Sequence, residues 1–140
     1  MNAARGRILI VEDDRFLRRA CQARLQQQGY TILTAGDGEE GLRVARAETP
    51  DLILLDILMP KLNGIEVLRI LREEEGTRAI PVLILSNSSR DGDIDRIRAL
   101  GVAGFFVKAN LSLQDLTRQV EQILEPGDPN GGADAANPGR

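Results

Sequence analysis

The chain has 140 residues and a formal net charge of −3, a length that fits one domain with a hydrophobic core. It contains no histidine and a single cysteine, Cys21, which excludes histidine-based catalysis, histidine metal sites, an internal disulfide and a structural zinc site. A lone cysteine fits best with a reducing cytoplasm. There is no signal peptide, no basic stripe and no apolar run near the roughly 20 residues of a membrane span, so we expect no direct nucleic-acid or membrane partner.

Five short apolar runs recur along the chain, separated by segments with helical periodicity. Leu17, Cys21 and Leu25, for example, are spaced as on one helix face, and Gly29 ends that helix. We expect Asp14 and Ser112 to cap the first and last helices. The predicted strands are 8–11, 30–35, 52–55, 82–85 and 104–107, and the predicted helices are about 17–28, 39–48, 65–75, 91–101 and 113–123.

The strands are unbroken apolar runs rather than alternations of apolar and polar residues, which is typical of a parallel sheet covered by helices on both faces. The sequence therefore predicts a doubly wound α/β fold with five parallel strands and five helices. In such folds, ligands bind outside the carboxyl ends of the strands.

Polar residues stand at that end of four predicted strands: Glu12 and Asp13, Asp56, Ser86, and Lys108. Three carboxylates at one edge repel each other, and a divalent cation relieves the repulsion because Mg²⁺ takes carboxylate, carbonyl and water oxygens; Mn²⁺ accepts the same ligands. A lysine and a hydroxyl suit a transferred phosphoryl group, and a carboxylate nucleophile would form an aspartyl phosphate.

Four segments in this order, ILIVEDD, DLILLDILMP, LILSNS and GFFVK, resemble the receiver domain of bacterial two-component response regulators, in particular the single-domain chemotaxis regulators. The resemblance covers about residues 7–125. It leaves a short polar lead at 1–6 and a Pro/Gly-rich tail at 126–140 that we expect to be disordered. It also implies a flavodoxin-like sheet with strand order 2-1-3-4-5.

The resemblance implies a metal site around a phosphoacceptor. Asp56 would accept the phosphoryl group. Asp13 would bind Mg²⁺ directly, Glu12 would assist through water, and the backbone carbonyl of Leu58 would be the third protein ligand.

The resemblance also implies how phosphorylation acts. Ser86 and Lys108 would contact the phosphoryl group, and Phe105 would be an aromatic switch that turns inward when the Ser86 hydroxyl moves toward phosphate. The donor would be a histidine kinase or a histidine phosphotransfer protein. The switched face, made by the fourth helix, fifth strand and fifth helix, would bind a downstream target or a second copy. Such a domain assists its own phosphorylation and dephosphorylation but does not turn over a separate substrate.

Three positions depart from the family pattern. Ala109 follows Lys108 where a cis proline is usual, so this bond is either trans in a reshaped loop or cis and strained. Asn87 replaces a small residue and could narrow access for the donor. Phe105 stands where tyrosine is frequent, so its ring carries no hydroxyl.

Other functions compete with this one. Asn87 and Ala109 motivate a phosphorylation-independent interaction module, whereas the acid triad argues against it. An aspartate-dependent phosphohydrolase is disfavoured because Leu58 replaces its second aspartate, and no glycine-rich nucleotide motif is present. Because neither Leu58 nor Ser88 can position an attacking water, we expect slow self-dephosphorylation. The length leaves no room for a DNA-binding output domain, so we expect either a stand-alone receiver or one cut from a longer protein.

Overall fold

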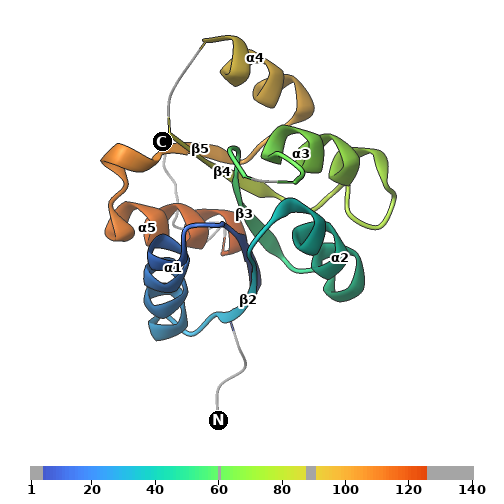
Figure 1. Cartoon of the computed structure of the whole chain (residues 1–140). Coiled ribbons are helices and arrows are strands. Elements are labelled where there is room, and N and C mark those ends of the chain that lie inside the picture. Colours follow the sequence, from blue (N-terminus) through green and yellow to red (C-terminus); the bar gives the residue numbers. More distant parts are fainter. Residues whose placement is uncertain (1–4, 60, 88–90, 126–140) are drawn as a thin grey trace, which may run out of the picture.

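A five-stranded parallel sheet forms the centre of the structure (Figure 1). The computed structural model describes residues 5–59, 61–87 and 91–125. The strand order is β2-β1-β3-β4-β5, which confirms the predicted fold class and order. The strands are β1 (Arg7–Val11), β2 (Thr31–Ala35), β3 (Leu52–Asp56), β4 (Val82–Ser86) and β5 (Gly104–Val107).

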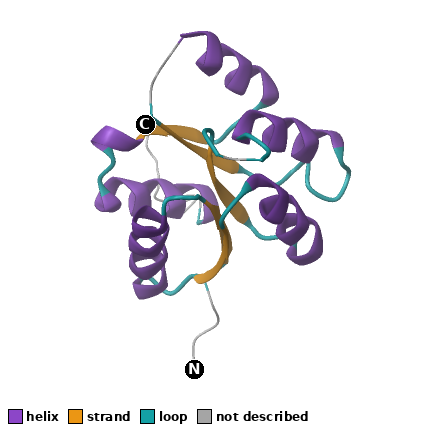
Figure 2. Ribbon diagram, viewed as in Figure 1, coloured by secondary structure: helices purple, strands orange, loops and turns teal. Residues whose placement is uncertain are grey.

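A helix follows each strand, as the alternating patterns predicted (Figure 2). Every boundary lies within two residues of its predicted position, and two of the differences have a clear physical cause. The second strand begins one residue after Tyr30, because the Tyr30 N–H donates to the Leu25 carbonyl instead of joining the sheet. The third helix stops at Glu73, because Glu74 is extended. The helices are α1 (Arg15–Gln27), α2 (Gly38–Glu48), α3 (Gly64–Glu73), α4 (Asp91–Leu100) and α5 (Leu113–Leu124), with a short 3-10 helix η1 (Lys108–Asn110) after β5.

The sheet separates two hydrophobic cores. α1 and α5 cover one face and α2, α3 and α4 cover the other (Figure 1). Successive residues of a strand point to opposite faces. In β1, for example, Leu9 belongs to the core under α2, α3 and α4, whereas Ile8 and Ile10 belong to the core under α1 and α5. Both faces of the central strands are therefore buried, which explains their unbroken apolar sequence.

Side chains cap the helices that begin at the carboxyl edge of the sheet. Asp14 accepts hydrogen bonds from the N–H groups of Phe16 and Leu17, and Ser112 accepts one from Asp115 at 3.2 Å, so both predicted caps are confirmed. Capping satisfies helix N–H groups that lack an intrahelical partner. The Asp14 cap starts α1 directly after Asp13 and so places this helix beside the polar residues that follow β1.

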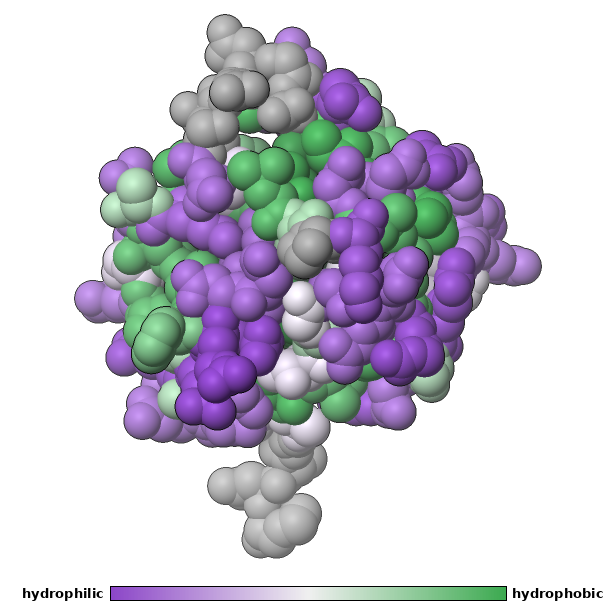
Figure 3. Space-filling model, viewed as in Figure 1, coloured by the Kyte–Doolittle hydropathy of each residue, from purple (hydrophilic) through white to green (hydrophobic). Residues whose placement is uncertain are grey.

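The face of the molecule shown in Figure 3 is mainly polar. Hydrophobic residues reach this face in the upper part of the view, where α3 and α4 lie in Figure 1. Among the described residues, no helix is long and apolar enough to cross a membrane.

Candidate functional site

The carboxyl ends of β1 and β3 lie side by side, because these strands are neighbours in the sheet. Asp56 is the last residue of β3, and Glu12 continues β1 by donating its N–H to the Ala35 carbonyl at 3.1 Å. One carboxylate oxygen from each of Glu12, Asp13 and Asp56 lies within 4.8 Å of the others. Glu12 and Asp56 are fully buried and Asp13 is exposed, so the three acids form a pocket that opens to solvent on the Asp13 side.

Lys108 reaches into this acid pocket from the end of β5. Its Nζ lies 2.9 Å from Glu12 Oε1, 3.0 Å from Glu12 Oε2 and 3.1 Å from Asp56 Oδ2. No cis peptide bond occurs in the described residues, so the Lys108–Ala109 bond is trans and the chain continues into η1. Replacing the usual proline by Ala109 therefore leaves the ammonium group inside the pocket. Lys61, the second lysine of the sequence, is 59% exposed and lies 3.5 Å from Asp37.

Burial and like charge control the electrostatics of the pocket. Loss of solvation, and then repulsion by Glu12, raise the pKa of Asp56 from 3.8 to about 7, although Lys108 opposes the shift. Burial alone would lower the pKa of Lys108, but its hydrogen bond to Glu12 and its attraction to Asp56 outweigh burial and raise it. The pocket thus holds a firmly protonated lysine beside a carboxyl group that titrates near neutral pH.

The donor set fits a hard divalent cation. Glu12 Oε1 and Asp56 Oδ2 are buried and accept no hydrogen bond from the described residues, although both lie near the Lys108 ammonium. Carboxylate oxygens with free lone pairs are the ligands that Mg²⁺ prefers. The pocket carries three carboxylates against one ammonium, so a further positive charge would relieve the remaining repulsion.

Two other expected site residues lie around this pocket. Ser86 ends β4 and is buried, with 7% of its surface exposed. Leu58 is 59% exposed, and its N–H donates to Asp56 Oδ1 at 3.2 Å. Asn87 is exposed next to Ser86, whereas Ser88 lies outside the described residues.

The aromatic pair of β5 is divided between the two faces of the sheet. Phe105 packs against the core under α2, α3 and α4, and Phe106 packs against the core under α1 and α5. Both rings are half-buried, so each packs against its core without being fully enclosed by it. β5 is an edge strand of the sheet, which leaves both rings partly open to solvent.

Sequence reasoning missed Arg18. Its Nη1 donates to the backbone carbonyl of Glu12 at 2.8 Å, which ties α1 to the end of β1. Helical spacing in the sequence could have indicated it. Arg18 lies three residues before the buried Cys21 and seven before the buried Leu25, and so shares their helix face.

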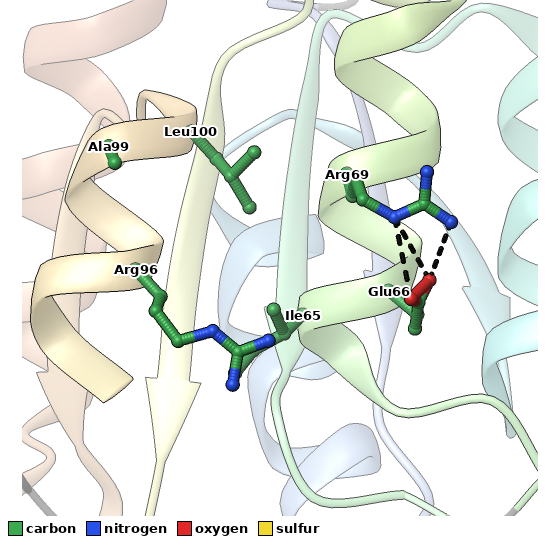
Figure 4. A pocket seen from close by; sticks show the side chains of 6 residues that line it. All are labelled: Ile65, Glu66, Arg69, Arg96, Ala99 and Leu100. Carbon is green, nitrogen blue, oxygen red and sulfur yellow. Dashed lines mark hydrogen bonds and ion pairs between the residues drawn. The ribbon is translucent and has the colours of Figure 1, made fainter. Parts of the chain in front are cut away.

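A groove of about 270 Å³ lies away from the acid pocket, between α3 and α4 (Figure 4). Arg69 hydrogen-bonds Glu66 on α3, and the Arg96 side chain extends from α4 toward Ile65 (Figure 4). The groove contains none of the strand-end residues, so the acid pocket remains the candidate site.

The chain thus combines a doubly wound α/β fold with an acid pocket and a lysine at the carboxyl edge of its sheet, where ligands bind in such folds. The family model "Response regulator receiver domain" matches residues 8–121, and the chain belongs to this family of two-component signalling domains.

Similar proteins come from several bacteria. The chain is 40% identical over 117 residues to an uncharacterized transcriptional regulatory protein, YcbL, of Bacillus subtilis, which covers 83% of the chain and 50% of that protein. Chemotaxis protein CheY4 of Vibrio cholerae superposes with a TM-score of 0.79 at 27% identity, covering 86% of this chain and 99% of that one. The receiver domain of a sensor histidine kinase from Pseudomonas aeruginosa, described with a magnesium ion in its active site cleft, gives a TM-score of 0.78 at 27% identity and covers 87% and 98% of the two chains. The chain spans about half the length of the curated relatives it matches.

Proposed function

We propose that this protein is a phosphorylation-driven switch whose Asp56 accepts a phosphoryl group, in the presence of Mg²⁺, from the phosphohistidine of a histidine kinase or a phosphotransfer protein. One observation carries the proposal: the buried carboxylates of Glu12 and Asp56 share the ammonium of Lys108, beside the exposed carboxylate of Asp13. The buried Cys21 thiol suits a reducing compartment, and we place the protein in the cytoplasm.

The phosphoacceptor must be ionised to react. An Asp56 oxygen forms a bond to phosphorus while the P–N bond of the partner's phosphohistidine breaks, and the electron pair of that bond returns to the imidazole nitrogen. Asp13 and Asp56, the Leu58 carbonyl and, through water, Glu12 would hold Mg²⁺, which supplies positive charge to the carboxylates and the phosphoryl oxygens when bound.

Lys108 and Ser86 then recognise the new phosphoryl group. The Lys108 ammonium, which contacts both buried carboxylates, is within reach of an anion built on Asp56. The Ser86 hydroxyl donates to a phosphoryl oxygen, and Phe105 turns inward in response. This shift favours one of two pre-existing arrangements of α4, β5 and α5, whose surface binds a target or a second copy.

The donor protein docks beside the acid pocket. Phe16 is 86% exposed and Leu58 is 59% exposed, the two large hydrophobic residues that protrude most in the part of the chain that the structure describes. Phe16 lies three residues after Asp13 and Leu58 two residues after Asp56. A partner that covers both side chains would bring its histidine to the pocket and bury apolar surface at the same time.

The rival function is a phosphorylation-independent interaction module with the same fold. It was motivated by Asn87 and Ala109. With Ala109 in a trans bond, Lys108 still contacts Glu12 and Asp56, which supports the phosphorylation-driven switch instead.

The test is the intact mass after incubation with acetyl phosphate, with and without Mg²⁺. We expect the wild type to gain one phosphoryl group only with Mg²⁺, Asp56→Asn to gain none, and Asp115→Asn, a matched change at an exposed aspartate, to behave as wild type. A wild type that neither gains mass nor binds Mg²⁺ would favour the rival. We also expect the label to persist for minutes after the donor is removed, because Leu58 offers no group that positions water.

A further inference from the structure

The backbone N–H, the backbone carbonyl and one carboxylate oxygen of Glu12 form hydrogen bonds, and α1 supplies the bond to the carbonyl. Its N–H donates to the Ala35 carbonyl, and its carboxylate accepts from the Asp14 N–H and from Lys108. Its backbone carbonyl accepts from Arg18 Nη1 at 2.8 Å. The Glu12–Asp13 peptide is therefore clamped on its carbonyl side by a charged donor.

Arg18 differs from the other arginines of α1. Arg15 and Arg19 are exposed, and their side chains form no hydrogen bond or ion pair with the described residues, whereas the Arg24 side chain donates to Thr117 at 3.3 Å. Long cationic side chains normally keep the head group in water. α1 is already anchored by the fully buried Cys21 and Leu25, so attachment of the helix does not by itself require Arg18 to bend toward β1.

The hydrogen bond from Arg18 to the Glu12 carbonyl matters for Asp13, the next residue. Asp13 is exposed, and none of the described residues hydrogen-bonds its carboxylate, in contrast to the carboxylate of Glu12. No hydrogen bond from the described residues therefore orients this side chain, and the backbone is the part of Asp13 that neighbouring groups hold in place. Because the peptide group is planar, fixing the Glu12 carbonyl also fixes the plane that carries the Asp13 nitrogen.

We propose that Arg18 is a positioning residue: its bond to the Glu12 carbonyl holds the Glu12–Asp13 peptide so that the Asp13 carboxylate faces Asp56 and the pocket is preorganised for a divalent cation. This inference rests on the proposed function. It predicts that loss of the bond weakens Mg²⁺ binding, since groups behind metal ligands set ligand orientation.

Charge and positioning predict opposite results, which makes the inference testable. If Arg18 acted only as a positive charge, removing it would reduce repulsion of Mg²⁺ and tighten binding. Arg19→Met removes the same charge from the neighbouring exposed position without breaking a bond, so it measures the effect of charge alone.

The experiment is a calorimetric Mg²⁺ titration at fixed ionic strength of the wild type, Arg18→Met, Arg18→Lys and Arg19→Met. We expect Arg18→Met to weaken Mg²⁺ binding about tenfold, Arg18→Lys to recover part of the loss, and Arg19→Met to bind as tightly as wild type or slightly tighter. Labelling by acetyl phosphate in Arg18→Met should need more Mg²⁺ for half-maximal rate but reach the wild-type rate at saturation.

Unchanged or tighter binding by folded Arg18→Met would overturn the inference and leave the proposed function intact. If Arg18→Met does not fold, the comparison of Arg18→Gln with Arg19→Gln takes its place, and equal affinities would overturn the inference. Failure of the wild type to bind Mg²⁺ would instead overturn the proposed function, and this inference with it.

Discussion

At the residue scale, Glu12 and Lys108 have opposite effects on the ionisation of the Asp56 carboxyl group. Burial and Glu12 oppose its negative charge, and Lys108 favours it. Because the first two effects are larger, the pKa of Asp56 rises to about 7, and the metal-free pocket resists the ionised form that phosphotransfer requires. A divalent cation would therefore act partly by making Asp56 a better nucleophile at neutral pH.

The raised pKa of Asp56 predicts how the stability of the metal-free protein depends on pH. The folded protein binds the Asp56 proton more tightly than the unfolded chain, so this contribution is present below pH 4 and is lost as the pH rises through about 7. In EDTA, the free energy of unfolding of the wild type should fall by roughly a few kcal/mol more between pH 4 and 8 than that of Asp56→Asn. Urea unfolding at several pH values measures this difference, and parallel curves for the two proteins would contradict it.

Lys108 predicts a second effect at the residue scale. Lys108→Met leaves the buried carboxylates of Glu12 and Asp56 without their cation and should lower the free energy of unfolding by roughly 3–5 kcal/mol at pH 8 in EDTA. Lys61→Met removes an exposed lysine and should change it by at most about 1 kcal/mol. Urea unfolding of the two variants tests this. A similar loss of free energy of unfolding in both would show that the buried position of Lys108 does not make its ion pairs more important than that of Lys61.

At the element scale, the close contact between α3 and the end of β3 holds Asp56 in place. Gly64, the first residue of α3, packs directly on this strand end: a Cβ atom there would collide with the Asp56 carbonyl oxygen and lie 2.6 Å from the Cα of Ile57. The flexible head of a side chain can move aside, but backbone atoms of a buried strand cannot do so cheaply. The position of Asp56, the proposed phosphoacceptor, therefore depends on the absence of a side chain at a residue eight positions further along the chain.

Gly64→Ala should accordingly disturb both stability and function. We expect roughly 1–3 kcal/mol of destabilisation from overpacking and slower labelling by acetyl phosphate, because the Asp56 backbone must shift. Gly76→Ala is the control, since no heavy atom lies within 4 Å of the added Cβ. Thermal unfolding and intact mass measure the two effects, and a Gly64→Ala protein that labels at the wild-type rate would show that the strand end tolerates the shift.

At the scale of the whole molecule, the two cores leave the carboxyl edge of the sheet as the place where the proposed phosphodonor, cation and switch residues would meet. Phe16 lies at this edge and contributes nothing to either core. If it contacts a donor protein, its burial contributes roughly 1.5–3 kcal/mol to docking. A small donor such as acetyl phosphate makes no such contact.

Phe16→Ser should therefore separate the two donors. Transfer from a phosphorylated histidine-phosphotransfer domain should fall by about tenfold, whereas labelling by acetyl phosphate should stay unchanged. Gln27→Ser, an exposed change at the other end of α1, should affect neither reaction. Rapid-quench measurements of the transfer rate give the comparison, and equal rates for wild type and Phe16→Ser would place the docking surface elsewhere.

The sequence by itself determined the fold class and the members of the acid pocket. Apolar runs and helical spacing are local signals, and parallel strands bring their carboxyl ends to one edge, so Glu12, Asp13, Asp56 and Lys108 could be placed together before their distances were known. The alternation of Phe105 and Phe106 was also predictable, because strand residues alternate between faces.

Only the tertiary structure decided the remaining features, because each depends on contacts between segments far apart in sequence. The packing of two helix layers decided which core each β5 ring joins. The sequence left open whether the bond before Ala109 is cis or trans. The structure shows that it is trans and that Lys108 still contacts Glu12, 96 residues away in the chain. Arg18 gained a role only from its distance to the Glu12 carbonyl, since helix spacing indicates which face a residue occupies but not which backbone group lies opposite it.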